Sequence, residues 1–381
     1  EGFSDLLIKW GVAPWLINLL VHGLGKGLNI TITFIPVLAA MFLCLGILES
    51  SGYMMRAAFI VDRLMRVLGL SGKSFVPMIV GFGCNVPAIM GTRSLSSSRE
   101  RILTIMMTPF MSCSARLAIY AIFVAAFFPV GGQNIIFSLY LIGILVAVLT
   151  GFALRTTVPA NEASLALMEM PDYRWPLASS LLRQVANRLQ KFLVKAGLLI
   201  VILCVMINGL GGTTLETIGK RLTPAFAPIG ISEENWPATV GLMSGLIAKE
   251  AVIGTLNSVY TQTAGVTGHV LENTLSKTAE SEMVKRFGGP IAAYAYLLFT
   301  LLYFPCVSVV AVIAKELNKK WAAFSVVWST GLAYIIAALF YQAATWNGLL
   351  SAASAWIIGL TVLLVSLFAC ARWMVRREQL S

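Results

Sequence analysis

The sequence contains few charged residues. Asp, Glu, Lys and Arg make up only 12% of its 381 residues, whereas 58% are hydrophobic and the mean hydropathy is +0.82. Soluble domains usually carry about 25% charged residues, and no segment here is long or polar enough to form a catalytic domain. The composition therefore excludes an ordinary soluble enzyme. It predicts an all-α transmembrane helical bundle that crosses the bilayer several times.

Acidic residues are also scarce, with 17 Asp and Glu against 28 Lys and Arg, which gives a formal net charge of +11. The basic residues lie between apolar runs and form no single patch, so contact with membrane lipid is favoured over nucleic acid. The basic clusters run from Arg56 to Lys73, Arg93 to Arg101, Arg155 to Lys195, Lys315 to Lys320 and Arg372 to Arg377. Basic residues next to membrane spans usually lie on the cytoplasmic side, and one membrane topology places every cluster there. In that topology the start of the chain lies outside and its end inside. If the full protein begins in the cytoplasm, one further crossing is expected before Glu1.

Histidine is nearly absent, and the cysteines have no disulfide spacing. The two histidines, His22 and His269, fall in segments that this topology places outside. Most of the six cysteines lie within apolar runs, so buried thiols are predicted instead of disulfides. A metal path through the membrane would therefore depend on thiolate, carboxylate, hydroxyl and carbonyl ligands, a mixture that suits borderline divalent ions such as Fe²⁺.

Long apolar runs are abundant. Seven segments contain the roughly 20 apolar residues that a transmembrane helix needs: 29–49, 102–128, 134–154, 192–211, 291–314, 321–344 and 352–373. The predicted organisation is an outer interfacial amphipathic helix (1–24), a first repeat unit (25–128), a spanning helix with a cytoplasmic loop (129–190), a second repeat unit (191–316) with an outer loop (261–290), and two C-terminal spanning helices (317–381).

Two apolar segments, 76–92 and 236–255, are interrupted by Gly and Pro. A broken helix survives at membrane depth only where protein or a wet cavity surrounds it, so a pair of such segments predicts a substrate path. Gly69-Leu70-Ser71 before the first segment resembles Gly230-Ile231-Ser232 before the second. The order of elements also recurs, from opposite sides of the membrane, which predicts an inverted repeat with two re-entrant segments.

Three cysteines lie beside Pro or Gly in apolar surroundings and are candidate metal ligands: Cys84, Cys113 and Cys306. Pro109 and Pro305 free the carbonyl oxygens of the residues four positions earlier, so each thiol has oxygen ligands nearby. A single buried Cys is more often a core residue, but three at three interruptions favour an ion path. The remaining cysteines, Cys44, Cys204 and Cys370, lie in plain apolar runs and are assigned to packing.

Glu250 is the acidic residue deep in the second broken segment, and it is a further candidate ligand because burying a carboxylate is costly. The alternative is a structural ion pair with Lys249. Weaker candidates are Asn85, Ser112 and Glu49, and Glu49 could instead cap the next helix or pair with Arg56. Arg116 is expected to have a structural partner. No catalytic residue and no cofactor is predicted in this chain.

At these residues the sequence resembles the membrane region of the bacterial ferrous iron transport protein B family. The similar motifs are Gly81-Phe82-Gly83-Cys84-Asn85-Val86-Pro87-Ala88, Pro109-Phe110-Met111-Ser112-Cys113-Ser114-Ala115-Arg116, Gly245-Leu246-Ile247-Ala248-Lys249-Glu250 and Tyr303-Phe304-Pro305-Cys306. The resemblance implies uptake of Fe²⁺ across the bacterial inner membrane, with the three cysteines in the ion path. It also implies an N-terminal GTP-binding domain, with GTP and Mg²⁺, outside this chain, together with small accessory proteins and a possible homo-oligomer.

Two alternatives keep the fold and change the function. A gate-type carrier of nucleosides or another small solute would use polar side chains, which Asn85, Thr92, Ser244, Thr255 and Asn257 offer. A non-transporting assembly domain would only anchor a partner. Flux of Fe²⁺, competition by nucleosides and the absence of any flux distinguish the three.

Overall fold

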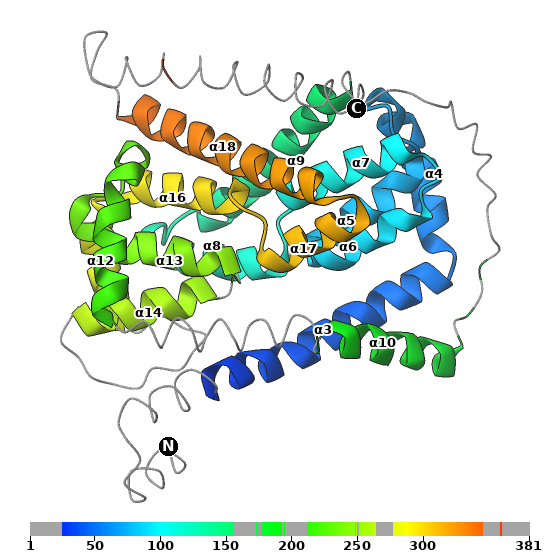
Figure 1. Cartoon of the computed structure of the whole chain (residues 1–381), viewed down its shortest axis with the longest axis horizontal. Coiled ribbons are helices and arrows are strands. Elements are labelled where there is room, and N and C mark those ends of the chain that lie inside the picture. Colours follow the sequence, from blue (N-terminus) through cyan, green and yellow to red (C-terminus); the bar gives the residue numbers. More distant parts are fainter. Residues whose placement is uncertain are drawn as a thin grey trace, which may run out of the picture. The chain divides into compact units, whose positions relative to one another are not determined.

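The structure is a computed structural model, and it describes residues 25–155, 173, 175, 177–192, 194, 212–247, 249, 251–263, 277–345 and 359. These residues form helices and no strand (Figure 1). The longer helices are α3 (Lys26–Ser50), α4 (Tyr53–Val67), α5 (Phe75–Gly83), α6 (Asn85–Gly91), α7 (Ser98–Met107), α8 (Ser114–Phe127), α9 (Gly132–Arg155), α10 (Ala178–Phe192), α12 (Gly212–Leu222), α13 (Trp236–Ile247), α14 (Ala251–Thr263), α15 (Lys277–Phe287), α16 (Pro290–Leu302), α17 (Val307–Glu316) and α18 (Lys319–Ala344). Short 3₁₀ turns are η2 (Gly72–Ser74), η3 (Thr92–Ser94), η4 (Thr108–Phe110), η6 (Thr223–Ile229) and η7 (Glu233–Asn235).

The chain divides into two compact units. The first, residues 1–57 and 169–218, contains α3 and α10, which lie side by side (Figure 1). Gly46 of α3 allows this approach, because a Cβ atom there would lie 2.7 Å from Leu181 Cδ1. Leu181 and Val185 are buried while Leu182 is 61% exposed, so α10 is amphipathic.

The second unit, residues 58–168 and 219–381, contains most of α4, the last residues of α12 and all the other described helices. Four helical segments of the described residues are long and apolar enough to cross a membrane: Ser98–Phe127, Gly132–Arg155, Pro290–Glu316 and Lys319–Ala344. The pair Ala39–Ser50 and Tyr53–Val67 supplies a fifth candidate if it counts as one span. A multi-pass helical membrane protein is thereby confirmed.

The predicted membrane spans agree with the helices of the structure to different degrees. Those at 134–154 and 321–344 are confirmed as the unbroken helices α9 and α18. The spans at 192–211 and 352–373 and the interfacial helix at 1–24 lie outside the described residues, apart from Gly359. Within the predicted outer loop at 261–290, Lys277–Phe287 forms α15, whose Met283 and Phe287 are buried.

The spans predicted at 102–128 and 291–314 are not single helices. The first ends as α7 and η4 and restarts as α8, and the second ends as α16 and restarts as α17. Proline explains both breaks, because Pro109 and Pro305 have no N–H to continue the helix. Hydropathy could not separate the halves, since both are apolar. The interruptions that the sequence analysis placed beside Cys113 and Cys306 are therefore full breaks between two helices.

The turn before each predicted broken segment is the same. Gly69 and Gly230 both adopt positive φ, at 75° and 92°. Leu70 N donates to Met65 O at 3.1 Å, and Ile231 N donates to Phe226 O at 3.4 Å. This is the bond pattern of a Schellman motif, in which the left-handed residue is usually Gly.

A serine follows each of these turns with the same backbone conformation. Ser71 and Ser232 both have ψ 157°, and each precedes a three-residue 3₁₀ turn that leads into α5 or α13. The resemblance between the two short sequences therefore reflects a repeated local structure. The opposite orientation of the two repeat units stays a prediction.

The second unit is buried most deeply along α16. Ten residues of this helix are buried, and α16 packs against α18, α8 and α9. The break that follows α16, at Tyr303–Cys306, therefore lies inside the protein. Broken backbone is tolerated at membrane depth in such surroundings.

Candidate functional site

Each of the three candidate cysteines is the residue immediately before a helix that follows a break. Cys84 precedes α6, Cys113 precedes α8 and Cys306 precedes α17. Their ψ angles of 130°, 165° and 152° are extended, and none of the three thiols caps the helix that it precedes. The sequence placed Cys113 near the middle of a helix, and Pro109 explains why a helix begins there instead. All three side chains are partly buried.

The backbone holds each cysteine in place. Cys113 O accepts from Arg116 N at 3.0 Å, Cys306 O accepts from Val309 N at 2.8 Å, and Cys84 O accepts from Ala88 N at 3.4 Å. These bonds form the first turn of each helix. The position of each thiol is therefore fixed by the start of a helix instead of by a loose loop.

The first two breaks contact each other. Ser114 Oγ, beside Cys113, donates to Gly83 O, beside Cys84, at 3.3 Å. The Asn85 amide nitrogen, oriented to donate, lies 2.9 Å from Gly81 O and 3.2 Å from Thr108 O. Asn85 thus donates to backbone carbonyl groups of both breaks, which indicates a structural role.

Arg116 supplies the partner for the carbonyl groups at the second break. Its side chain is 1% exposed, and Nη1 donates to Pro109 O and Met111 O at 2.9 Å each. The expected structural pairing is confirmed, although the acceptors are carbonyl oxygens. Ser112, also buried, lies with its Oγ 3.4 Å from Tyr120 Oη.

The other two breaks also contact each other. Lys249, in the break between α13 and α14, is 4% exposed, and its Nζ lies 3.3 Å from the centroid of the Tyr303 ring. Tyr303 begins the break that carries Cys306, and its hydroxyl donates to Leu242 O at 3.2 Å. Glu250, the predicted carboxylate ligand, lies outside the described residues.

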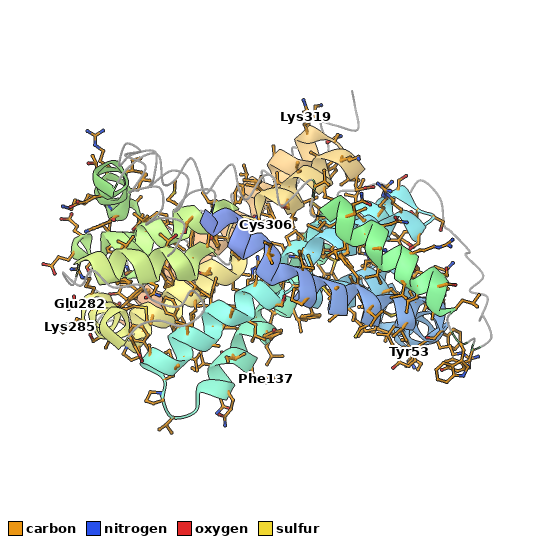
Figure 2. The ribbon with its side chains drawn as sticks, turned by 90° about the horizontal axis from the view of Figure 1, so that it is seen from below. Tyr53, Phe137, Glu282, Lys285, Cys306 and Lys319 are labelled. Carbon is orange, nitrogen blue, oxygen red and sulfur yellow. The ribbon has the colours of Figure 1, made fainter. Side chains whose placement is uncertain are left out.

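The two pairs of breaks are joined by α6 and α17, which pack against each other and begin immediately after Cys84 and Cys306. In Figure 2, Cys306 lies among the helices, whereas Glu282 and Lys285 lie together at one end. Within the described ranges, no group of three or more His, Cys, Asp or Glu side chains could hold a metal ion. The structure therefore places the three thiols at breaks without gathering them into one cluster.

Glu49, the weakest candidate, belongs to the first unit. It is exposed at the end of α3 and accepts from Arg188 Nη2 of α10 at 3.1 Å. The ion-pair partner of Glu49 is thus Arg188, and the Arg56 guanidinium lies 4.0 Å from the centroid of the Tyr173 ring. The pairing with α10 points to a structural role.

Sequence reasoning missed Glu316, the last residue of α17. Its side chain is 4% exposed and pairs with Arg93 and with Arg101, whose Nη2 lies 2.6 Å from Oε2. A lone acid between Lys315 and Lys319 was the available signal. The ion cluster, defined as Arg93, Arg101 and Glu316, ties the end of α17 to η3 and α7, just beyond the end of α6.

Comparison with known proteins decides the family. One family profile, described as "Nucleoside recognition", matches residues 31–127 and 193–320, and another, described as "Ferrous iron transport protein B C terminus", matches residues 136–188. The Fe(2+) transporter FeoB of Legionella pneumophila is 48% identical over 98% of this chain and 56% of its own length. The chain belongs to the ferrous iron transport protein B family.

Other members of the ferrous iron transport protein B family agree. The Fe(2+) transporter FeoB proteins of Shigella flexneri and of Escherichia coli K12 are each 43% identical over 87% of this chain and 50% of their own length. The chain thus spans about half the length of the curated relatives that it matches. No solved structure matches it.

Proposed function

We propose that this chain is the transmembrane core of a transporter for Fe²⁺ uptake across the bacterial inner membrane, and that the ion passes Cys84, Cys113 and Cys306. The observation that carries the proposal is the position of the three thiols, each at the start of a helix after a break. Relatives of the chain are named Fe(2+) transporter FeoB.

Thiolate is the form of cysteine that binds metals. At each break it would replace part of the hydration shell of Fe²⁺, and at the breaks that carry Cys113 and Cys306 the carbonyl oxygens freed by Pro109 and Pro305 would assist it. Because the thiols lie on three helices without forming one cluster, they would bind the ion in turn, each weakly enough to release it.

The contacts of the other candidate residues suggest a different role for each. Glu250 stays a proposed ligand next to Lys249. Asn85 and Ser112 would hold the breaks in shape, since Asn85 faces backbone carbonyl groups and Ser112 faces Tyr120. Glu49, paired with Arg188, would not touch the ion. GTP-dependent regulation, accessory proteins and a homo-oligomer are proposed for the whole protein.

Uptake of Fe²⁺ into liposomes containing the full-length protein tests this function. Cys84→Ser, Cys113→Ser and Cys306→Ser should each lower the initial rate at least tenfold, because a hydroxyl is a much poorer ligand for Fe²⁺ than a thiolate. Cys44→Ser, at an exposed position of α3, is the matched control and should transport normally. Normal rates in all three well-folded test variants would refute the thiol path.

A nucleoside carrier is the second candidate, favoured by the description of the larger matching profile. The polar side chains weigh against it. Thr92 Oγ1 donates to Ile89 O at 2.6 Å and Ser244 Oγ donates to Gly241 O at 2.8 Å, so both hydroxyl protons are already engaged. Competition of nucleosides with Fe²⁺ uptake would support this candidate.

A further inference from the structure

A buried lysine lies at the break opposite Cys306. Lys249 is 4% exposed, and its ammonium group lies 3.3 Å from the centroid of the Tyr303 ring. Aromatic faces attract cations, and the attraction strengthens where water is excluded. The ammonium is thus held against the stretch of chain that leads, three residues later, to Cys306.

The position of the Tyr303 ring is fixed from several sides. Its hydroxyl donates to Leu242 O at 3.2 Å. Gly245 leaves room for it, because a Cβ atom there would lie 2.2 Å from the Tyr303 hydroxyl oxygen. A ring held in this way gives the lysine a defined resting place instead of one of many rotamers.

Lys249 is not the only cation at this place. Arg116 is buried near enough to Tyr303 to interact electrostatically with its hydroxyl group. Its Nη1 donates to two carbonyl oxygens, so its charge is immobile. Lys249 instead carries its charge on a flexible four-carbon stem. A divalent cation that reaches Cys306 therefore meets repulsion from both, and the charge of Lys249 is the one that can move.

We propose that Lys249 is a tethered cation that competes with Fe²⁺ beside Cys306 and keeps the ion from binding too tightly to leave. The inference rests on the proposed transport function and adds a residue that determines affinity and release. In the resting protein the ammonium group occupies the face of Tyr303. When Fe²⁺ arrives, repulsion moves the ammonium aside, and its return helps to expel the ion. Conduction needs this balance of attraction and release.

Fe²⁺ binding and transport by the full-length protein in lipid bilayers, under reducing conditions, test the proposal. Lys249→Met removes the charge and keeps the apolar stem. It should bind Fe²⁺ at least tenfold more tightly, measured by competition with a chromogenic ferrous chelator, and should lower both KM and kcat of uptake. Lys249→Gln gives a second neutral side chain if the Met variant does not fold. Lys319→Gln, an exposed lysine labelled in Figure 2, removes one positive charge elsewhere and should change neither quantity.

The double variant Lys249→Met with Cys306→Ser locates the effect. Loss of the tightening in this variant supports competition at Cys306. If the neutral variants fold and bind Fe²⁺ no more tightly than the parent protein, or if tightening persists without the Cys306 thiol, the inference is overturned. Failure of the parent protein to transport Fe²⁺ would instead refute the proposed function, so the two failures are distinguishable.

Discussion

Arg93 Nε lies 3.0 and 2.9 Å from the two carboxylate oxygens of Glu316, although the residues are 223 positions apart in the chain. Arg101 reaches the same carboxylate, with Nη2 2.6 Å from Oε2. The hydrogen bonds and the charge of Glu316 raise the pKa of Arg93 above its ordinary value, so this arginine stays charged at every working pH. One carboxylate therefore joins the two halves of the second unit that carry Cys84 and Cys306.

Glu316→Gln should lower the free energy of unfolding by about 1 to 3 kcal/mol, because hydrogen bonds to charged groups contribute roughly that much. The value stays at the lower end of the range for buried pairs since the Arg93 side chain is 55% exposed. Thermal unfolding in detergent micelles measures the change. The exposed neighbour provides the control, as Lys315→Gln should leave stability unchanged. Equal stability of the two variants would show that the ion cluster contributes little.

Gly230→Ala should destabilise the protein by about 2 kcal/mol or more. Left-handed backbone costs a residue with a Cβ atom roughly 1–2 kcal/mol, and at φ 92° the new atom would lie 2.3 Å from Tyr341 Cε2. Gly254→Ala, in α14, is the matched control because no heavy atom lies within 4 Å of its added Cβ. A shift of the unfolding temperature that is the same for both variants would contradict this account.

Arg116→Met should lower the free energy of unfolding by about 2 to 6 kcal/mol, since two buried carbonyl oxygens lose their donor and each unsatisfied group costs roughly 1–3 kcal/mol. Arg116→Lys keeps the charge without the planar donor geometry and should show an intermediate loss. Chemical unfolding followed by tryptophan fluorescence ranks the three proteins. A Met variant as stable as the parent would mean that other groups satisfy these oxygens.

The stability of the protein should depend on pH through Glu282, which lies outside the spanning helices. A hydrogen bond from Lys285, at 3.2 Å, lowers its pKa below the ordinary 4.5. A lowered carboxyl pKa contributes stability that is present above the unfolded-state pKa and is lost as the pH falls through the folded-state value. Unfolding temperatures recorded from about pH 7 to about pH 3 should therefore show parent and Glu282→Gln converging at the acid end. A constant difference across the range would exclude the ionic contribution.

Much of the helical framework could be predicted from the sequence, because long apolar runs determine α9 and α18 directly. The repeated turns were also predictable, since a Gly at Gly69 and Gly230 is needed for left-handed backbone. Pro109 and Pro305 indicated interruptions near Cys113 and Cys306, but the positions at which the helices end and restart could not be read from the sequence. Hydropathy averages over a window and cannot report where a backbone hydrogen bond is missing.

The candidate site was predictable in part. Proline and glycine beside Cys84, Cys113 and Cys306 indicated the breaks, but only the structure shows that each cysteine starts a helix. Partners distant in sequence, such as Lys249 with Tyr303, carry no local signal. Glu316 was overlooked for the same reason, since its two arginines lie in another repeat unit.

The short helices α6 and α17 have a shared mechanical consequence. Each helix follows a cysteine directly, and both helices end near the ion cluster. Helix α6 has seven residues and α17 has ten. At 1.5 Å per residue these are rigid struts of roughly 10 and 15 Å. Because Glu316 pairs with Arg93 and Arg101, the far ends of both helices are tied to one carboxylate, whereas the two thiols lie immediately before their opposite ends. The separation of Cys84 and Cys306 is therefore set from the far ends of the two helices as well as by the packing between them.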